Sequence, residues 1–266
     1  MLSIIFASRV KDNIDSQLKR LLDSAMVCIS PEDYDKIEFI IKYDWDDDNR
    51  PTPKFLAQYP FKIKTFVYAR GEGRQYNHHH CEYLFANTNP EFKWVMNMSD
   101  DFVFTRHGFL NDLKGIKDEY MIVGYTNPSF KENAAVEVYK RCFPVNFDQD
   151  KGIGELCPIF SRKLVEVCQN MGWQPNLDAW VVILEVTLYQ KYQILLWKSI
   201  QRFYQRTGTW GSGDTPTFPG TELYNNMTIT GRRLPQNHYL FTLMDQQAKN
   251  IYLNMIADGI DINQYR

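Results

Sequence analysis

The first hundred residues alternate between short apolar runs and segments with helical spacing, and this alternation strongly restricts the possible folds. Apolar residues recur at helical spacing in 14–26, and a second helix is expected over 76–86. Four runs rich in β-branched or aromatic residues are predicted to be buried strands: 2–7, 37–43, 63–68 and 94–98. The pattern predicts an α/β fold with a mostly parallel (mixed) central sheet and helices on both faces.

The second half of the chain is less regular. Strands are expected at 120–125 and 194–197, and helices at 162–171 and 178–192. A glycine- and proline-containing loop begins at residue 206, and an apolar stripe at helical spacing predicts a C-terminal helix. We therefore expect one domain over residues 1–205. Residues 206–266 should form a flexible loop and a C-terminal helical extension packed on that domain.

Composition excludes several classes of function. The formal charge is -2 for 266 residues, so no basic excess points to nucleic acid or an anionic membrane surface. The five cysteines show no Cys-x-x-Cys spacing, which is typical of free thiols in a reducing compartment and predicts a cytoplasmic protein. No apolar run reaches the length of a membrane span.

Carboxylates follow two of the predicted strands directly. Asp100 and Asp101 come after the strand at 94–98, where two adjacent like charges need solvent, a partner or a cation. A hard cation such as Mg²⁺ or Mn²⁺ would take one or two carboxylates and fill its other positions with water and substrate phosphates. A solvated Asp-Asp turn explains the spacing equally well. Asp44 abuts the strand at 37–43 and could accept hydrogen bonds from a base N–H or a ribose hydroxyl.

Two N-terminal segments resemble GT-A glycosyltransferases, particularly those of the family 2 type. Ser3–Arg9 and the helix after it look like the opening strand and helix of that family. Ile40–Asp48 resembles its second-strand motif, an apolar run followed by Asp-Asp-Gly-Ser-x-Asp. Asp44 and Asp48 match the acidic positions of this motif, whereas the residues that flank Asp44 do not match it.

Two later segments extend the resemblance over roughly residues 2–200. Arg70–Asn77 is similar to the turn and helix start that precede the family's metal strand. Asn97–Asp101 falls where the family has its Asp-x-Asp motif. Ser99 takes the place of the first aspartate, so Asp101 is the better candidate for a metal ligand.

The resemblance implies a nucleotide-diphosphate sugar as donor, a UDP- or GDP-sugar, and a glycan or another hydroxyl compound as acceptor. Asp100 would face the donor sugar or the ribose. Two arginines beside glycine turns could clamp the diphosphate, although surface arginines there need no function. The implied donor-binding residues are Ala7, Ser8, Arg9, Asp44, Arg70, Arg74 and Asp100.

The resemblance also implies a metal cofactor, Mn²⁺ or Mg²⁺, and a general base. Asp101 would bind the metal, and His238 could supply the C-terminal histidine ligand found in some GT-A enzymes, although a lone histidine is more often structural. Asp178 opens a long apolar helix and fits the base of inverting members, and it fits a helix N-cap equally well. Glu185, two turns later, ranks second.

Two other functions make different demands on the sequence. A sugar-1-phosphate nucleotidyltransferase would need a glycine-rich phosphate loop after the first strand, and residues 7–12 contain no glycine. A catalytically degenerate glycosyltransferase-like domain that binds a glycan or a partner stays open, because Ser99 replaces the first aspartate of the motif.

Overall fold

A computed structural model describes residues 1–8, 17–47, 50–68, 82–126, 157–168, 177–206 and 239–266 of the chain. These residues belong to two compact units. The first unit draws on segments within 1–72, 79–117 and 201–216, and the second unit on the remainder. Among the described residues, no helix combines the length and the apolar character that crossing a bilayer requires.

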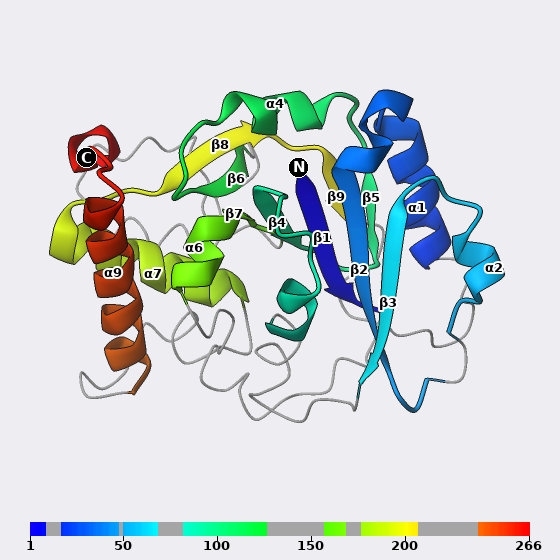
Figure 1. Cartoon of the computed structure of the whole chain (residues 1–266), viewed down its shortest axis with the longest axis horizontal. Helices are drawn as coiled ribbons and strands as arrows, with labels where there is room; N and C mark the ends of the chain where they lie inside the picture. The colour runs from blue at the N-terminus through cyan, green and yellow to red at the C-terminus, as the bar shows by residue number, and fades with distance from the viewer. Residues whose placement is uncertain (9–16, 48–49, 69–81, 127–156, 169–176, 207–238) are drawn as a thin grey trace. The chain divides into compact units, whose positions relative to one another are not determined.

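Seven strands have the sheet order β3-β2-β1-β4-β7-β6-β8, and β5 and β9 pair separately (Figure 1). β1 is parallel to β2 and β4, β2 is parallel to β3, and β6 is antiparallel to β7. The predicted α/β fold with a mixed sheet is therefore confirmed. The strands of the main sheet are β1 (Leu2–Ala7), β2 (Ile37–Asp44), β3 (Lys62–Tyr68), β4 (Trp94–Asn97), β6 (Ile122–Thr126), β7 (Ile159–Ser161) and β8 (Trp197–Gln201).

In the first unit, β1 and β2 are the most deeply buried strands. Their sequences are near-continuous apolar runs because both faces of a parallel sheet are covered. β2 nevertheless buries three charged groups, Glu38, Lys42 and Asp44. The hydroxyl group of Ser3 donates to Oε1 of Glu38 at 2.7 Å, which helps to satisfy the carboxylate inside the sheet.

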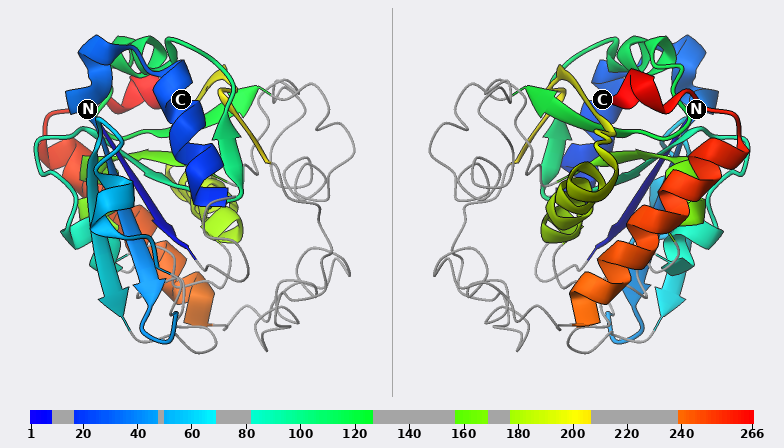
Figure 2. Two further views of the ribbon diagram at one scale, coloured as in Figure 1. Left: turned by 90° about the vertical axis from the view of Figure 1, so that its right-hand side faces the viewer. Right: turned by 90° about the vertical axis from the view of Figure 1, so that its left-hand side faces the viewer.

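Helical segments cover both faces of this part of the sheet (Figure 2). Helix α1 (Gln17–Cys28) buries residues at helical spacing, as the sequence predicts. The short helix α2 (Pro53–Leu56) begins after Thr52, whose side chain accepts a hydrogen bond from the N–H of Phe55 at 3.2 Å. On the other face, helical residues 82–86 pack Leu84 into a core cluster with Ile5, Ile40 and Val95.

A stacked aromatic core holds the rest of the first unit together. β5 (Phe102–Phe104) pairs antiparallel with β9 (Tyr204–Arg206), and helix α4 (Phe109–Gly115) follows β5. The rings of Phe109 and Phe203 stack with centroids 4.0 Å apart, and Phe104 stacks on both. Two segments that lie a hundred residues apart in sequence are thereby fixed to each other.

The second unit is organised around α7 (Leu177–Tyr192) and α9 (Tyr239–Ala257). The indole Nε1 of Trp180 on α7 donates to Oε1 of Gln247 on α9 at 2.9 Å. Nε2 of Gln247 in turn donates to the carbonyl oxygen of Cys168 at 2.6 Å, just after helix α6 (Arg162–Val167). A buried polar residue in the apolar stripe of α9 therefore joins three helices.

Most predicted strands lie within one or two residues of those observed, whereas helix α6, predicted to end at residue 171, ends at Val167. The apolar run predicted as a strand over 194–197 is largely a connection, and β8 begins only at Trp197. Gln193 has φ of 57°, which ends α7, and the N–H of Leu195 donates to the carbonyl oxygen of Tyr265 at 2.8 Å. The carbonyl oxygen of Leu196 accepts a hydrogen bond from the N–H of Ile122 on β6 at 2.6 Å, so this buried segment contacts the sheet without forming a strand.

Gly124 on β6 lies directly under the indole ring of Trp197 on β8. A Cβ at this position would lie 1.8 Å from Cζ2 of the indole, far inside van der Waals contact. Glycine is therefore required here by close packing and not by backbone conformation.

Gly124→Ala should lower the free energy of unfolding by about 1–3 kcal/mol, because the indole must move to admit the methyl group. Gly115→Ala is the matched control, since no atom lies within 4 Å of a Cβ there. Urea denaturation of both variants measures the difference. Equal effects at the two glycines would contradict the close contact.

Candidate functional site

The carboxyl ends of the parallel strands in the first unit meet at one edge of the sheet. β1 pairs with β2 on one side and with β4 on the other, and Ile5 lies opposite both Ile40 and Asn97. Residues that follow these strands are therefore brought close together, where open α/β sheets place their ligands.

Ser8 and Asp100 meet at this edge. The hydroxyl group of Ser8 donates to Oδ2 of Asp100 at 2.5 Å, and the N–H of Ser8 donates to the carbonyl oxygen of Lys42 at 2.9 Å. Ser8 is buried, and Asp100 is partly exposed. The bond joins two residues 92 positions apart that the sequence assigns to one site. Ala7, another predicted donor residue, immediately precedes Ser8.

Asp44 ends β2 with its carboxylate in a buried ion pair. Lys42 lies on the same face two residues earlier, and its Nζ pairs with Oδ1 of Asp44. The N–H of Asp47 donates to the carbonyl oxygen of Asp44 at 3.1 Å, which folds the acidic loop back over the strand end. Asp47 is buried, whereas Trp45 is 65% exposed. Asp44 is thus positioned by the sheet and already balanced by a cation.

Asp101 is buried and directly precedes β5, whereas its neighbour Asp100 is half-buried. The two carboxylates therefore differ in environment, as expected when the chain turns between them. Within the described part of the chain, no group of three or more His, Cys, Asp or Glu side chains gathers in a geometry that would hold a metal ion.

Sequence reasoning missed Tyr43 as a feature of this edge. Its side chain lies on the opposite face of β2 from Lys42 and Asp44, because strand residues alternate. Burial raises the pKa of the phenol above its usual range, and the charges of Asp100 and Asp47 raise it further. The hydroxyl is therefore a neutral donor at every physiological pH. A tyrosine at the end of an apolar strand gave no signal beyond that of an ordinary core residue.

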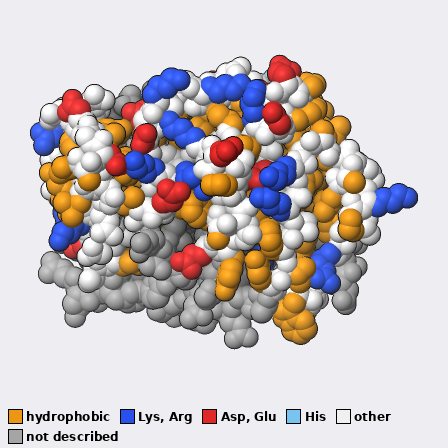
Figure 3. Space-filling view, in the orientation of Figure 1, with side chains coloured by type: hydrophobic (Ala, Val, Ile, Leu, Met, Phe, Trp, Pro, Cys, Tyr) orange, Lys and Arg blue, Asp and Glu red, His pale blue; other side chains and the backbone are white. Residues whose placement is uncertain are grey.

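An aromatic shelf beside Asp44 also escaped prediction. In register with Asp44 lies Tyr68, whose ring is 4.8 Å from that of Tyr83 and 6.1 Å from that of Phe66. Figure 3 shows hydrophobic side chains gathered over this part of β2 and β3. Tyr83 is half-exposed, so the shelf offers a flat surface next to a charged strand end.

Several predicted site residues lie outside the described residues or only partly within them. Asp178 is the second residue of α7, and the structure describes its backbone position but not its side chain. The predicted donor and metal residues that lie outside the described residues are Arg9, Arg70, Arg74 and His238. Cys28, Cys157 and Cys168 are buried.

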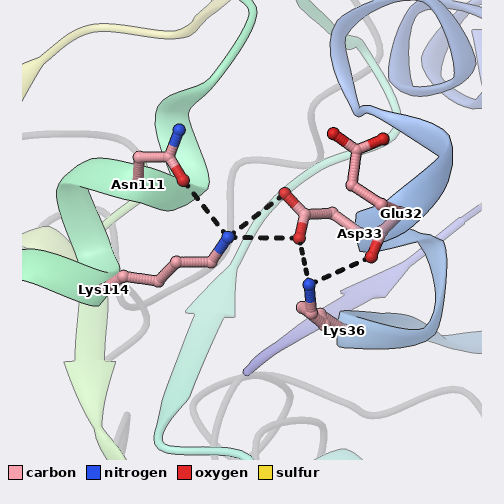
Figure 4. A network of polar contacts seen from close by, with 5 residues as sticks. All are labelled: Glu32, Asp33, Lys36, Asn111 and Lys114. Atoms are coloured by element: carbon pink, nitrogen blue, oxygen red, sulfur yellow. Dashed lines mark hydrogen bonds and ion pairs between the residues drawn. The ribbon is translucent and has the colours of Figure 1, made fainter.

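A second polar cluster lies at the opposite end of β2 and has a structural role (Figure 4). Asp33, in the 3₁₀ turn η1 (Pro31–Lys36), accepts from Nζ of Lys36 at 2.5 Å and from Nζ of Lys114 on α4 at 3.1 Å. These bonds, Lys36 first, hold the pKa of Asp33 below its usual value. The cluster ties η1 to α4, and the carboxylate of Asp33 is paired with two ammonium groups.

Glu185 on α7 is completely buried in the second unit. Both carboxyl oxygens lack a hydrogen-bond partner among the described residues. Burial raises the pKa of this group to about 8, and the nearby N–H of Leu196 offsets the rise only in part. The carboxyl group is therefore uncharged at neutral pH, as desolvation requires.

Comparison with known proteins establishes the fold. The sequence matches no protein-family profile and no curated protein. Crystal structures of residues 1–349 of S. aureus TarS are similar, with TM-scores of 0.54 for the UDP-GlcNAc complex, 0.51 for the UDP complex and 0.50 without a named ligand. Sequence identities are 13%, 12% and 15% in that order.

The similarity extends over almost the whole chain. The matches cover 99%, 96% and 97% of this chain and 77%, 72% and 73% of the TarS chains, in the same order. TarS is a family 2-like glycosyltransferase. The chain therefore has a GT-A-like glycosyltransferase fold, as its sequence motifs predict.

Glu185→Gln should change how stability depends on pH. The folded chain keeps the proton of Glu185 up to about pH 8, whereas the unfolded chain releases it near pH 4.5. The stability that this protonated group contributes is therefore fully present below pH 4.5 and is lost progressively as the pH rises toward 8.

Urea denaturation of the wild type and of Glu185→Gln from pH 5 to pH 8 measures this loss. The variant should become the more stable of the two as the pH rises, because glutamine has no proton to release. Glu91→Gln, at an exposed position, controls for the loss of a carboxylate. Parallel pH profiles for wild type and Glu185→Gln would contradict the assignment.

Proposed function

We propose that this chain is a glycosyltransferase that moves a sugar from a nucleotide-diphosphate sugar to an acceptor hydroxyl. The observation that carries the proposal is the Ser8–Asp100 bond at the carboxyl edge of the parallel strands, within a GT-A-like fold. The TarS structures with UDP and UDP-GlcNAc support a uridine nucleotide as the first ligand to test.

The donor nucleotide lies across this edge of the first unit. Ala7, Ser8 and Arg9 approach it from β1, Asp44 accepts hydrogen bonds from the base or the ribose, and Asp100 faces the ribose or the sugar. Because Lys42 balances Asp44, a neutral base or ribose is bound there at a low electrostatic cost. Arg70 and Arg74 clamp the diphosphate through bidentate hydrogen bonds.

The residues at this edge fit a hard divalent cation, Mn²⁺ or Mg²⁺. Asp101 would supply a carboxylate oxygen, and His238, which lies outside the described residues, would supply a further ligand. Such an ion takes one or two protein carboxylates and completes its shell with water and substrate phosphates, so a large protein cluster is unnecessary. When bound, the ion neutralises the charge that develops on the departing diphosphate.

The transfer inverts the configuration at the anomeric carbon. Asp178 accepts the proton of the acceptor hydroxyl, whose oxygen forms a bond to the anomeric carbon from the face opposite the diphosphate. The bond from that carbon to the diphosphate oxygen breaks, and its electron pair leaves with the nucleoside diphosphate. The transition state has oxocarbenium character, as in glycoside hydrolysis.

A panel of UDP- and GDP-sugars, each with and without Mn²⁺, tests the reaction class. A glycosyltransferase should release UDP or GDP slowly to water, and faster when a suitable acceptor is present. A degenerate binding domain should bind a donor without releasing nucleotide. Formation of a nucleotide sugar from a sugar 1-phosphate and a nucleoside triphosphate would instead identify a nucleotidyltransferase.

Asp178→Asn should reduce turnover by about 10²–10⁴-fold with little change in donor affinity, because it removes only the proton acceptor. Nucleotide release under saturating donor and acceptor measures the effect. Asp35→Asn, at an exposed position in η1, is the matched control. Turnover within a few-fold of wild type would show that Asp178 is not the base.

Asp101→Asn should abolish the gain in UDP affinity that Mn²⁺ provides, because an amide oxygen carries no charge for the cation. Calorimetric titration of UDP with and without Mn²⁺ measures this gain in wild type and variant. An undiminished Mn²⁺ effect in Asp101→Asn would overturn the metal assignment.

A further inference from the structure

The aromatic shelf of Phe66, Tyr68 and Tyr83 continues the sheet edge that is proposed to bind the donor nucleotide. Tyr68 ends β3 directly in register with Asp44, the last residue of β2. The rings of Tyr68 and Tyr83 are inclined by 28° with centroids 4.8 Å apart, and the ring of Phe66 lies within 3° of parallel to that of Tyr68. Three rings therefore form an apolar surface at the end of two neighbouring strands.

The shelf lies on the same face of the sheet as the Lys42–Asp44 ion pair. Alternate residues of a strand share a face, so Ile40, Lys42 and Asp44 lie on one side of β2. Leu84, next to Tyr83, packs into a cluster with Ile40, which places this helical segment over the same side. The sheet therefore does not separate the shelf from the carboxylate that is proposed to contact the donor.

The outer part of the shelf is accessible to solvent. Tyr83 is 50% exposed, whereas Leu84 beside it is completely buried and anchors the segment. An exposed aromatic ring at a binding edge can stack on another planar ring. Because Tyr83 already stacks on Tyr68, little side-chain entropy remains to be lost when a ligand binds.

The chemistry of the shelf suits one part of a nucleotide sugar. Its ring surface offers no charge to a diphosphate, which needs cationic or N–H donors. A sugar ring carries hydroxyl groups around its rim, and each hydroxyl that loses water needs a hydrogen-bond partner. A nucleobase combines a flat apolar face with a polar edge, and every base can stack on an aromatic side chain. The base therefore matches the shelf best.

We propose that Tyr83 and Tyr68 form the stacking surface for the nucleobase of the donor. The base lies against the accessible ring of Tyr83 with its polar edge toward the end of β2, and the ribose and diphosphate continue along the edge toward β1 and β4. The stacking surface rests on the proposed function, because it requires a nucleotide as donor. It adds Tyr83 as the residue that selects for an aromatic base.

Calorimetric titration with UDP and with 5,6-dihydrouridine diphosphate tests the stacking directly. The two nucleotides have the same hydrogen-bonding edge, but saturation of one ring double bond puckers the base and removes its aromatic face. The wild type should bind UDP about tenfold more tightly than the dihydro nucleotide, because stacking on an aromatic side chain contributes at least this much to base binding.

Three variants assign the effect to Tyr83. Tyr83→Leu should weaken UDP about tenfold and leave the dihydro nucleotide unchanged, so that this variant binds both equally. Tyr83→Phe keeps the ring and should retain the affinity and the preference of the wild type. Tyr252→Leu is the matched control, since Tyr252 stacks on Tyr192 in the second unit, and it should alter neither affinity.

A purely structural role for Tyr83 predicts a different pattern. Tyr83→Leu would then weaken both nucleotides by the same factor, and this result would overturn the proposal, as would a wild type that binds both nucleotides equally. Unchanged UDP affinity in Tyr83→Leu with a raised KM for the acceptor would assign the shelf to the acceptor instead. All these outcomes leave sugar transfer itself intact, whereas a wild type that binds neither UDP nor GDP would refute the proposed function and the stacking surface together.

Discussion

The parallel pairing of β1 with β2 on one side and β4 on the other is the constraint on which the candidate site depends. It sets the register in which Ala7, Asp44 and Asn97 end their strands along one edge of the sheet. With this register, the hydroxyl group of Ser8 donates to Asp100 at 2.5 Å although the two residues are 92 positions apart. A shift of one residue in either pairing would turn these side chains to the other face and take the site apart.

Alternation along the same strands divides the polar chemistry of the first unit into two regions. On one face, Lys42 and Asp44 neutralise each other at the strand end, so this pair would present no net charge to the proposed donor. On the other face, the side chain of Tyr43 is buried beside a largely apolar pocket. Three consecutive residues of β2 thus serve two environments, and the charges of Asp100 and Asp47 act on Tyr43 as well.

Sequence patterns predicted the fold well because buried parallel strands and amphipathic helices leave strong local signals. The apolar runs at 2–7 and 37–43 and the stripe of α9 lie close to the observed elements. Tyr43 was missed because only the three-dimensional structure shows that no hydrogen-bond partner lies near its hydroxyl group among the described residues. The aromatic shelf of Tyr68 and Tyr83 was missed because it joins a strand end to a helix through stacking that no local pattern records. The apolar run at 194–197 misled because the segment is buried and makes single backbone hydrogen bonds to Ile122 and Tyr265 in place of a continuous strand ladder.

Calorimetric titration of UDP against the wild type, Ser8→Ala and Asp100→Asn tests the central claim most directly, namely that the carboxyl edge of β1, β2 and β4 binds the donor nucleotide. The account predicts measurable binding to the wild type and a loss of about tenfold or more in both variants, because each removes one partner of the bond that shapes the edge. UDP binding of equal strength to all three proteins, or none to the wild type, would contradict it.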